Sequence, residues 1–449
     1  MKSLQKGKMW LFAVGQLGWA ILSGLISNWL VYFYQPDETA VAAGQKLLLP
    51  QGLVILGIFT VIGGVTALGR VFDAVTDPWI ASLSDKCTSK NGRRIPFLKW
   101  ASLPLAIATV LVFCAPVPKV SSLNAVWVFV FVMLYYLCIT AYCTPYAALI
   151  PELGHDQKER LNISTAISLT FIVGTAFAYA APVVWGLFED SLGRMAAMRL
   201  TFAIFAAVAF ICMMVPVFAI REKDYVNSTP AKGTALSSLI KTFRNRDFRV
   251  FVGSDILYWI ALTMFQTGLP FFVTSLLCLK ESMSTVYFVA MTALSLVFYV
   301  PINMLARKIG KKKIVFTAFL LFALSYLYTS FLGNAIPISP VVQGFVLVVA
   351  AAIPMAVFGI LPQAMVADVA ESDAYQTGEN REGMFYAART FAFKLGQSVA
   401  MLLFTAIAAS SGNGALAYRQ IAGTASVFCL LGGVVLLCYN EKKVTEHLR

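Results

Sequence analysis

Long runs of apolar residues, separated by short polar segments, recur along the whole chain. Each run is about 20 residues or longer, which is the length of helix that crosses ~30 Å of hydrocarbon. Backbone groups in lipid must be satisfied within the chain, and the runs are too long for barrel strands, so they predict helices. The twelve runs lie at residues 10–34, 51–80, 96–115, 124–150, 161–187, 196–220, 250–276, 284–306, 314–332, 341–363, 384–409 and 418–440.

The polar segments divide the twelve runs into two sets of six. The longest polar segment, residues 221–249, carries seven basic residues. Short polar motifs also recur at matching places after the second and eighth runs and after the fourth and tenth runs. They are Ser84-Asp85 with Gly92-Arg93-Arg94, Arg307 to Lys312, Pro145 to Glu152, and Pro362 to Asp368. Internal repeats of this kind are typical of carriers that rock around a central site. We therefore predict an all-α membrane protein with two pseudo-symmetric six-helix bundles, 1–220 and 250–449, joined by a basic linker at 221–249.

Composition and charge agree with a membrane protein. Hydrophobic residues make up 59% of the chain and charged residues only 13%, about half of the charged fraction of a soluble domain. The net charge is +13. With the N-terminus inside, 26 of the 35 Lys and Arg residues fall in cytoplasmic segments. This asymmetry follows the positive-inside rule, so the basic charge indicates topology rather than nucleic-acid binding. We expect a bacterial-type inner-membrane protein with both termini in the cytoplasm, surrounded by lipid and acting as a monomer.

Several function classes find no support in the sequence. The eight cysteines show no disulfide pattern, and two histidines give little basis for a transition-metal site. No phosphate loop of the G-x-x-x-x-G-K-[ST] type is present, which argues against an ATP-driven pump. No nucleophile and base stand out for an intramembrane enzyme. We predict no enzymatic activity and no cofactor other than a coupling ion.

The second run contains charges that are costly in a membrane. Arg70, Asp73 and Asp77 follow one another at about one helical turn each, so both carboxylates share a face. An ionised group in mid-membrane costs roughly 2.5–3.5 kcal/mol and persists where it faces a partner or a wet cavity. Thr76 lies beside the acids, and Pro78 frees a backbone carbonyl. These oxygen groups suit Na⁺ or a titrating proton. The alternative is that the two acids only neutralise Arg70.

The eleventh run, 384–409, holds Arg389 and Lys394. We expect Lys394 to contact the solute by hydrogen bonds or to balance the acids of the second run. The alternative is snorkelling to the cytoplasmic surface, which suits Arg389 well and Lys394 poorly. Asp255, near the start of the seventh run, is interpreted as a capping or gate residue.

Aromatic side chains in the spanning runs are candidates for stacking on a sugar ring. We expect this role for Trp19, Tyr142 and Tyr146. The alternative is that they pack in the protein or form an interfacial belt, which is the commoner role of aromatic residues in spanning helices.

The segments predicted to be cytoplasmic carry acidic and basic residues that resemble gates. In an outward-facing state, such pairs can tie the two halves together. Their alternative role is a solvated loop in which each pair is worth under about 1 kcal/mol. The two sets are Asp85 with Arg93 and Arg94, and Asp368 and Glu371 with Arg381.

Two stretches with matching spacing carry a family resemblance. The first is Gly69-Arg-Val-Phe-Asp-Ala-Val-Thr-Asp-Pro78, followed by Gly92-Arg-Arg-Ile-Pro96. The second is Ala367-Asp-Val-Ala-Glu-Ser-Asp-Ala-Tyr-Gln-Thr-Gly378, followed by Arg381-Glu-Gly383 and Lys394-Leu-Gly396. These motifs resemble the glycoside–pentoside–hexuronide:cation symporter family, the melibiose-carrier branch of the major facilitator superfamily.

The resemblance implies the major facilitator fold and cation-coupled transport of a sugar. It implies that Asp73 and Asp77 correspond to the family's cation ligands, with Thr76 where an Asn often occurs. It also implies that Thr140 matches a cation-site hydroxyl and that Lys394 matches the family's lysine on the eleventh helix.

Three departures from the melibiose-carrier pattern change this expectation. An Asp shared there by cation and sugar aligns with Cys143, a Lys-Asp pair aligns with Trp19-Ala20, and an Arg has no counterpart around Thr165. A galactoside site of that type is therefore absent, and a three-acid Na⁺ site is incomplete.

The function predicted from the sequence is symport of a sugar, glycoside or sugar acid with H⁺ or Na⁺ by alternating access. The coupling ion is expected at Asp73 and Asp77, with Lys394 in the central pocket. One carboxylate can carry a proton alone, so the loss of the third acid favours H⁺ over Na⁺. One alternative keeps the fold and changes the cargo to a lysophospholipid-like amphiphile, because the family also resembles animal lysophospholipid carriers. Another is a sensor that binds a solute without moving it.

Overall fold

The computed structural model describes residues 4–89, 92–154, 157–225, 242–333, 336–378 and 382–446. Across these ranges the chain is helical, and the only β-type pairing is an isolated bridge between Ile55 and Phe59. The predicted all-α fold is confirmed. The chain forms two compact units, residues 1–232 and 233–449, called here the first and second unit. Their boundary lies inside the segment predicted as a linker.

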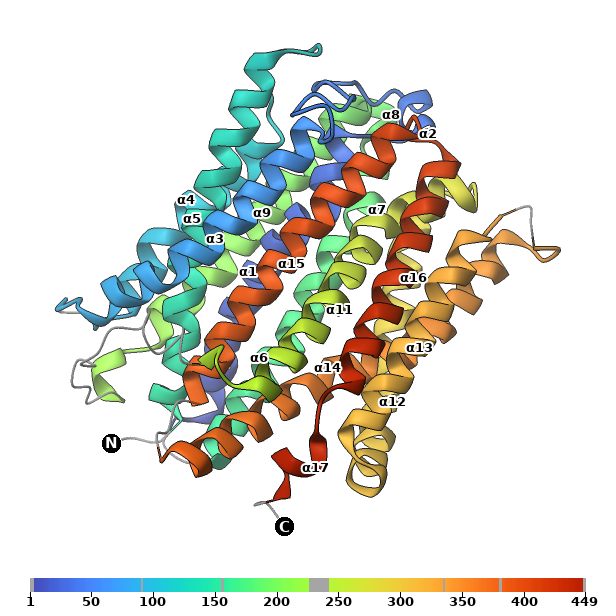
Figure 1. The fold of residues 1–449 in the computed structure, drawn as a ribbon. Coiled ribbons are helices and arrows are strands. Elements are labelled where there is room, and N and C mark those ends of the chain that lie inside the picture. The colour runs from blue at the N-terminus through green and yellow to red at the C-terminus, as the bar shows by residue number, and fades with distance from the viewer. Residues whose placement is uncertain are drawn as a thin grey trace. The chain divides into compact units, whose positions relative to one another are not determined.

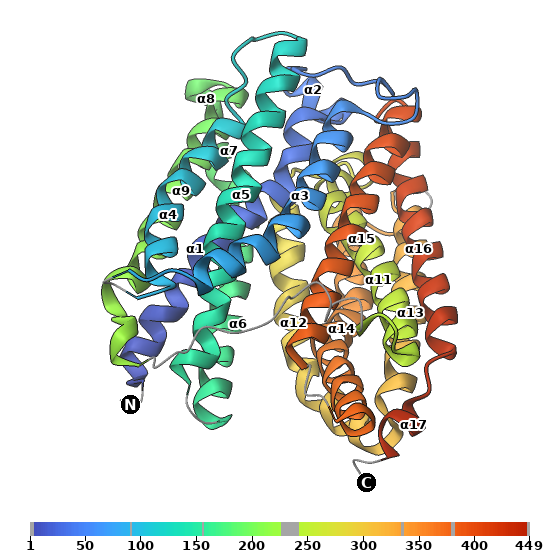
Figure 2. The same ribbon diagram turned by 60° about the vertical axis from the view of Figure 1, so that its left-hand side comes forward.

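The helices of the two units are shown in Figures 1 and 2. In the first unit they are α1 (Lys6–Tyr34), α2 (Glu38–Ala42), α3 (Val61–Asp85), α4 (Ile95–Val112), α5 (Ser122–Leu153), α6 (Gln157–Tyr179), α7 (Ala181–Gly186), α8 (Glu189–Leu192), α9 (Arg194–Ala219) and the 3₁₀ turn η1 (Glu222–Asp224). In the second unit they are α11 (Arg246–Phe271) with the π-helical turn η2 (Phe272–Leu276), α12 (Ser282–Ile309), α13 (Lys311–Ser330), α14 (Pro340–Thr377), α15 (Glu382–Ser410), α16 (Ala415–Leu437) and α17 (Glu441–Val444).

Eleven helices of the described chain are long and apolar enough to cross a membrane. The helix α3 does not count among them because it carries Arg70, Asp73, Asp77 and Asp85. Its 25 residues nevertheless extend over about 37 Å, which is enough to span the hydrocarbon. The second predicted span is therefore present as a helix of spanning length, although its charged residues lower its mean hydropathy.

The second predicted span was placed wrongly at its start. Residues 51–60 are not helical, and α3 begins only at Val61. Thr60 is its N-cap, and the Thr60 hydroxyl accepts a hydrogen bond from Gly63 N at 3.0 Å. Just before it, Leu56 and Gly57 take left-handed backbone angles, which no helix tolerates in its interior. Apolar composition alone did not reveal this turn.

The tenth predicted span, 341–363, ends too early. The helix α14 continues to Thr377 and is terminated by Gly378, whose φ of 70° closes the helix in the left-handed conformation. Asp368 and Glu371 were predicted in a cytoplasmic loop and instead lie on the last turns of α14. The prediction uses runs of apolar residues, so it does not detect a helix that continues into a polar stretch.

In the first unit, α1 is packed between α6 and α9. Glycines at the helix crossings allow the backbones to approach closely. A Cβ added to Gly18 of α1 would lie 2.5 Å from the Ala209 carbonyl oxygen of α9. A Cβ on Gly174 of α6 would lie 2.7 Å from the Leu17 carbonyl oxygen of α1. Small residues at such crossings are characteristic of helices that associate in membranes.

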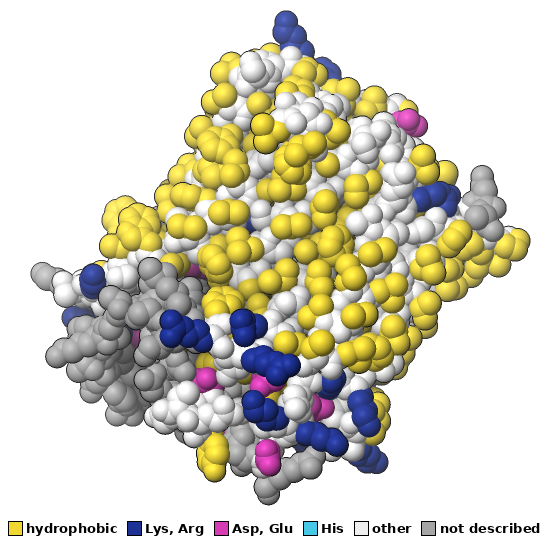
Figure 3. All heavy atoms as spheres, viewed as in Figure 1, with side chains coloured by type: hydrophobic (Ala, Val, Ile, Leu, Met, Phe, Trp, Pro, Cys, Tyr) yellow, Lys and Arg dark blue, Asp and Glu magenta, His cyan; other side chains and the backbone are white. Residues whose placement is uncertain are grey.

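In the second unit, α11 packs on α15 and α16, while α13 packs on α14 and α16. Large apolar side chains on the outer faces are solvent-exposed, as at Val297 (67%), Leu324 (61%) and Val434 (60%). Figure 3 shows these helices covered by apolar side chains, with Lys and Arg gathered at the end where α17 lies. An apolar belt bounded by basic side chains is the surface expected of a protein embedded in lipid.

Candidate functional site

The two acids of α3 face α5 and meet hydroxyl groups there. Thr140 donates a hydrogen bond to Asp73 Oδ1 at 2.5 Å, and Thr144 donates one to Asp77 Oδ1 at 3.2 Å. The partners of each pair are separated by 67 residues, so α3 and α5 run in the same direction with a fixed register. Asp73 is buried, Asp77 is half-buried, and both lie in the middle part of α3. We call these four residues the α3–α5 seam.

Arg70 lies one turn before this seam and bridges to two other helices. Its Nη2 donates to Ser27 Oγ of α1 at 3.0 Å, and its guanidinium lies 5.4 Å from the centre of the Tyr136 ring of α5. Arg70 also interacts electrostatically with Asp73. A Cβ on Gly69 would lie 2.3 Å from the Tyr136 ring, so the absence of a side chain at Gly69 leaves room for that ring to pack against α3. Arg70 thus places a positive charge beside Asp73 on α3.

Thr76 is placed differently from the other hydroxyls. Its Oγ1 donates to the carbonyl oxygens of Phe72 (2.9 Å) and Asp73 (3.1 Å), as a helical threonine commonly does. Thr144, which the sequence analysis did not single out, takes the position facing the second acid. The seam therefore offers two carboxylates and two hydroxyls from α3 and α5, a set of oxygen ligands that suits Na⁺ or a proton.

The three aromatic candidates separate into two kinds. Tyr142 and Tyr146 are buried, and their hydroxyls donate to the carbonyl oxygens of Met213 (3.0 Å) and Phe12 (2.7 Å). These bonds tie α5 to α9 and α1, which favours packing over sugar stacking as their role. Trp19 is only half-buried, and its Nε1 donates to Gln16 Oε1 at 3.1 Å. Of the three, only Trp19 is partly exposed.

In the second unit, a buried ion pair joins α11 to α15. Arg389 donates from Nε and Nη2 to Asp255 Oδ2 and Oδ1, at 2.8 and 3.0 Å, and both side chains are about 5% exposed. Snorkelling is therefore not the role of Arg389. Capping is not the role of Asp255, because α11 begins at Arg246 and its N-cap is Asn245. Lys394 is half-buried further along α15, twelve residues beyond its first residue and so about 18 Å along the axis.

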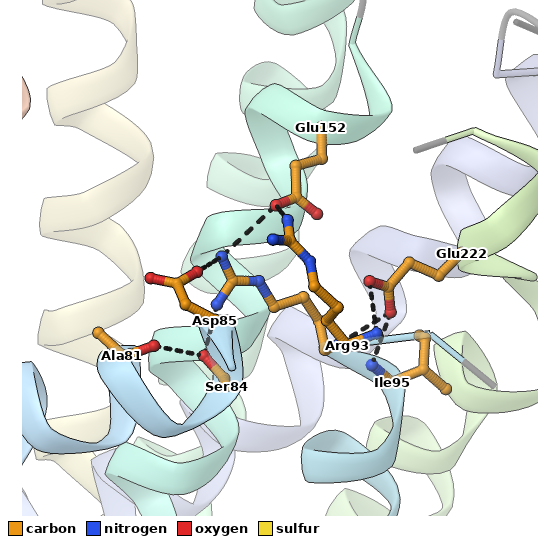
Figure 4. Close-up of polar contacts among 8 residues, drawn as sticks. Ala81, Ser84, Asp85, Arg93, Ile95, Glu152 and Glu222 are labelled. Atoms are coloured by element: carbon orange, nitrogen blue, oxygen red, sulfur yellow. Dashed lines mark hydrogen bonds and ion pairs between the residues drawn. The ribbon is translucent and has the colours of Figure 1, made fainter. Parts of the chain in front are cut away.

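Figure 4 shows a charged cluster where α3 turns into α4. Arg94 binds Asp85 at 2.5 Å and Ser84, and it lies 3.4 Å from Glu152 at the end of α5. Arg93 binds the same Glu152 oxygen at 2.8 Å. Burial raises the pKa of Glu152 above its ordinary value, while Arg94 and Arg93 oppose that rise. The predicted pairing of Asp85 with the two arginines is thus present for Arg94, whereas Arg93 pairs with Glu152.

A further carboxylate, Glu222, caps α4, which begins directly after these arginines. It is almost fully buried and accepts hydrogen bonds from the backbone N–H groups of Arg93 and Arg94 at 2.8 Å and of Ile95 at 3.1 Å. The start of a helix offers free N–H groups and partial positive charge, which a carboxylate satisfies. Gly92 has φ +109°, and a Cβ there would lie 2.2 Å from the Glu222 carboxylate. The glycine is therefore needed for the cap.

The second unit repeats this construction. Glu441 accepts from the backbone N–H groups of Lys311 (2.6 Å) and Lys312 (3.2 Å) at the start of α13, next to Gly310 with φ +93°. Lys311 Nζ binds the Asp368 carboxylate of α14 at 2.6 and 2.8 Å. The motif echo seen in the sequence thus corresponds, in each unit, to a carboxylate that caps a helix start and to a basic–acidic pair beside it.

The contacts of Asp368 differ from those predicted for it. Asp368 binds Lys311 rather than a residue of its own motif, and Glu371 is exposed. Arg381 lies outside the described residues. Glu222, Glu441 and Lys311 were missed as functional candidates, although each is a charged residue within a few positions of a predicted helix end, which is the available signal.

Residues 11–438 match the family model described as MFS/sugar transport protein. The chain belongs to the MFS/sugar transport protein family. As a member of this family it is an integral membrane protein and a secondary transporter of the major facilitator fold, not an enzyme. The resemblance inferred from the motifs around Asp73 and Lys394 is confirmed.

The relatives of this MFS/sugar transport protein are distant in sequence, but each similarity extends over most of both chains. An uncharacterized symporter of Synechocystis is 24% identical over 95% of this chain and 92% of its own. The isoprimeverose transporter of Lactiplantibacillus pentosus is 20% identical over 84% and 74%. The sodium-dependent lysophosphatidylcholine symporter 1-A of Danio rerio is 21% identical over 85% and 80%.

Proposed function

We propose that this transporter is a symporter that couples the movement of a sugar-like solute to H⁺ or Na⁺, with the coupling ion bound at the α3–α5 seam. The observation that carries the proposal is the pairing of Asp73 with Thr140 and of Asp77 with Thr144 in the middle part of a spanning helix. The family description and the isoprimeverose transporter support a sugar-like cargo.

The charge balance of the seam gives a reason for an ion. Each ionised side chain in mid-membrane costs roughly 2.5–3.5 kcal/mol on insertion scales. Arg70 places a positive charge beside Asp73, and Thr144 donates a hydrogen bond to Asp77. A cation bound during part of the cycle lowers the cost of holding both carboxylates ionised at this depth. Its binding shifts the inward–outward equilibrium to the extent that the two states bind it differently.

The choice between H⁺ and Na⁺ depends on the number of oxygen ligands. Na⁺ needs several, and the seam supplies two carboxylates and two hydroxyls. Cys143 stands on α5 between the two threonines, where the sodium-coupled relatives of the melibiose type have a third acid. A proton needs only one carboxylate. We therefore favour H⁺. The sodium-dependent relative from Danio rerio is the observation that favours Na⁺ instead.

The charged clusters at the starts of α4 and α13 fit a gating role in this cycle. Each holds a helix start with a buried or half-buried carboxylate, Glu222 or Glu441, and links it to the end of a neighbouring helix. We place both clusters and both termini on the cytoplasmic side of a bacterial-type inner membrane, following the distribution of Lys and Arg.

The second candidate function keeps the fold and exchanges the cargo for an amphiphilic lipid. The zebrafish lysophosphatidylcholine symporter is the observation that favours it. A sensor that binds a solute without transport is the third candidate, and it differs from both in giving no uptake.

Uptake into sealed proteoliposomes decides among these functions. The panel is methyl β-D-glucopyranoside, methyl β-D-xylopyranoside, glucuronate and lysophosphatidylcholine, each with and without an imposed pH or Na⁺ gradient. The proposal expects gradient-driven accumulation of a sugar-like solute. Accumulation of lysophosphatidylcholine alone supports the lipid carrier, and binding of a panel solute without any uptake supports the sensor.

A further inference from the structure

The helices α11 and α15 lie side by side in the second unit with a constant register (Figures 1 and 2). Three contacts define it, and each joins residues 134 apart in the sequence. They are the Asp255–Arg389 ion pair, the stacked rings of Trp259 and Phe393 with centres 4.6 Å apart, and the Thr267–Met401 hydrogen bond. Thr263 and Gln397 are also 134 apart and lie one turn beyond the aromatic pair. They therefore belong to the same seam.

Three polar atoms on this α11–α15 seam lack a partner. Trp259 Nε1, Thr263 Oγ1 and Gln397 Oε1 are buried, and none of them forms a hydrogen bond with any described residue. Thr263 is 7% exposed and Gln397 is 9% exposed. Buried polar atoms are nearly always hydrogen-bonded because leaving them without a partner destabilises the fold. Three such atoms within one turn of each other call for a partner from outside the chain.

The chemistry of that partner follows from the three atoms. The indole N–H only donates, the carboxamide oxygen only accepts, and the threonine hydroxyl does either. A hydroxyl group can accept a hydrogen bond from the Trp259 indole and donate one to the Gln397 carboxamide oxygen at the same time. An ionised carboxylate cannot donate a hydrogen bond, and an ammonium group cannot accept one, so neither can bind both atoms.

The surroundings of the three atoms also suit a sugar. The charge of Arg389 is already balanced by its bidentate pair with Asp255, one turn before the aromatic pair. Flat aromatic surfaces next to a few polar groups are typical of sites for small ligands with apolar and polar faces. Trp259 is half-buried, and its Nε1 atom is buried. Trp259 and Gln397 both lie near the middle of their helices, the depth at which transporters bind solute.

We infer that the α11–α15 seam is a subsite for a hydroxyl-bearing solute, with one hydroxyl held by Trp259 Nε1, Thr263 Oγ1 and Gln397 Oε1. This inference rests on the proposed function and specifies its substrate class as a solute that presents a hydroxyl group to this seam, as a glycoside does.

The first test needs no solute. The Thr263→Val change removes a hydroxyl without a partner, so the midpoint of thermal unfolding of the purified protein should rise by about 2 °C. Thr329→Val is the control, because Thr329 of α13 is also buried and its hydroxyl donates to the Ser325 carbonyl oxygen at 2.8 Å. The control should lower the midpoint. If Thr263→Val lowers it as well, the protein or bound water already satisfies the hydroxyl, and the inference is wrong.

The second test uses the methyl glucoside, the methyl xyloside and glucuronate as probes. A neutral glycoside should raise the unfolding midpoint of the wild type, and Thr263→Val and Gln397→Met should each raise KM for its uptake roughly 2- to 10-fold. Trp259→Phe keeps the ring, removes the N–H and should do the same. Trp29→Phe is its control, since Trp29 Nε1 donates to the Ala178 carbonyl oxygen in the first unit.

The outcomes separate this inference from the proposed function. If the wild type takes up a glycoside and the three variants leave KM within 2-fold, the subsite is wrong and symport stands. If a glycoside binds in a way that the variants weaken but is not taken up, the subsite stands and symport is wrong. If glucuronate alone is taken up, the same three variants should raise its KM, and a KM that stays within 2-fold makes the subsite wrong. If no probe is bound or moved, both proposals are wrong.

Discussion

Breaking the Asp255–Arg389 pair should destabilise the second unit strongly. Both side chains are about 5% exposed, and two hydrogen bonds of 2.8 and 3.0 Å join them between α11 and α15. Replacing Arg389 by Met leaves a buried carboxylate without its cation, and replacing Asp255 by Leu leaves a buried guanidinium. For such buried pairs, loss of one partner costs about 3–5 kcal/mol. For a unit of this size, that corresponds to a fall in unfolding midpoint of roughly 6–20 °C.

The double variant gives the sharper result. Asp255→Leu combined with Arg389→Met removes both charges together and should return the stability to within about 1 kcal/mol of the wild type, because apolar residues often replace a buried pair without loss. Thermal unfolding of the purified protein, followed by tryptophan fluorescence, measures all three variants. Lys443→Gln is the control: Lys443 is 56% exposed and 3.8 Å from Asp247, so its loss should cost under about 1 kcal/mol. The reasoning fails if each single variant is as stable as this control.

The other predictions concern the helix caps and the topology. Glu222→Gln should destabilise the first unit by about 1–3 kcal/mol, because it weakens three hydrogen bonds at the start of α4. Amide hydrogen exchange should then speed up at Arg93 to Ile95, and unchanged exchange there would contradict the cap. Single cysteines placed at positions 93 and 312 in a cysteine-free background should react only with reagents that reach the cytoplasm. Labelling of either position from outside intact cells would overturn the orientation.

Much of the fold was predictable because apolar runs of spanning length leave the backbone few alternatives to helix. The errors occurred where a local turn or a polar stretch decided the helix end. The run before Val61 is apolar, yet the Thr60 cap and the left-handed residues before it delay α3. The end of α14 is polar, yet it stays helical until Gly378.

The candidate site was only partly predictable. The helical spacing of Asp73 and Asp77 places them on one face whatever the rest of the chain does, and the family motif pointed to Thr140. The contact of Asp77 with Thr144 depends on the register between α3 and α5, which no local pattern reveals. The same holds for Glu222, which caps a helix start about 128 residues earlier in the chain. Arg389 and Asp255 were seen as separate charges because only tertiary packing brings them together.

Gradient-driven uptake by variants of the two seam acids tests the central claim most directly. The solute is the panel compound that the wild type accumulates, and the variants are Asp73→Asn and Asp77→Asn, with Asp190→Asn at an exposed position of the first unit as the matched control. The account predicts that the wild type and the control accumulate the solute under an imposed pH gradient, while both seam variants lose accumulation and can retain solute exchange. Stimulation of the wild type by Na⁺ without any response to pH would refute the preference for a proton. Full gradient-driven accumulation by both seam variants would contradict the assignment of the ion site itself.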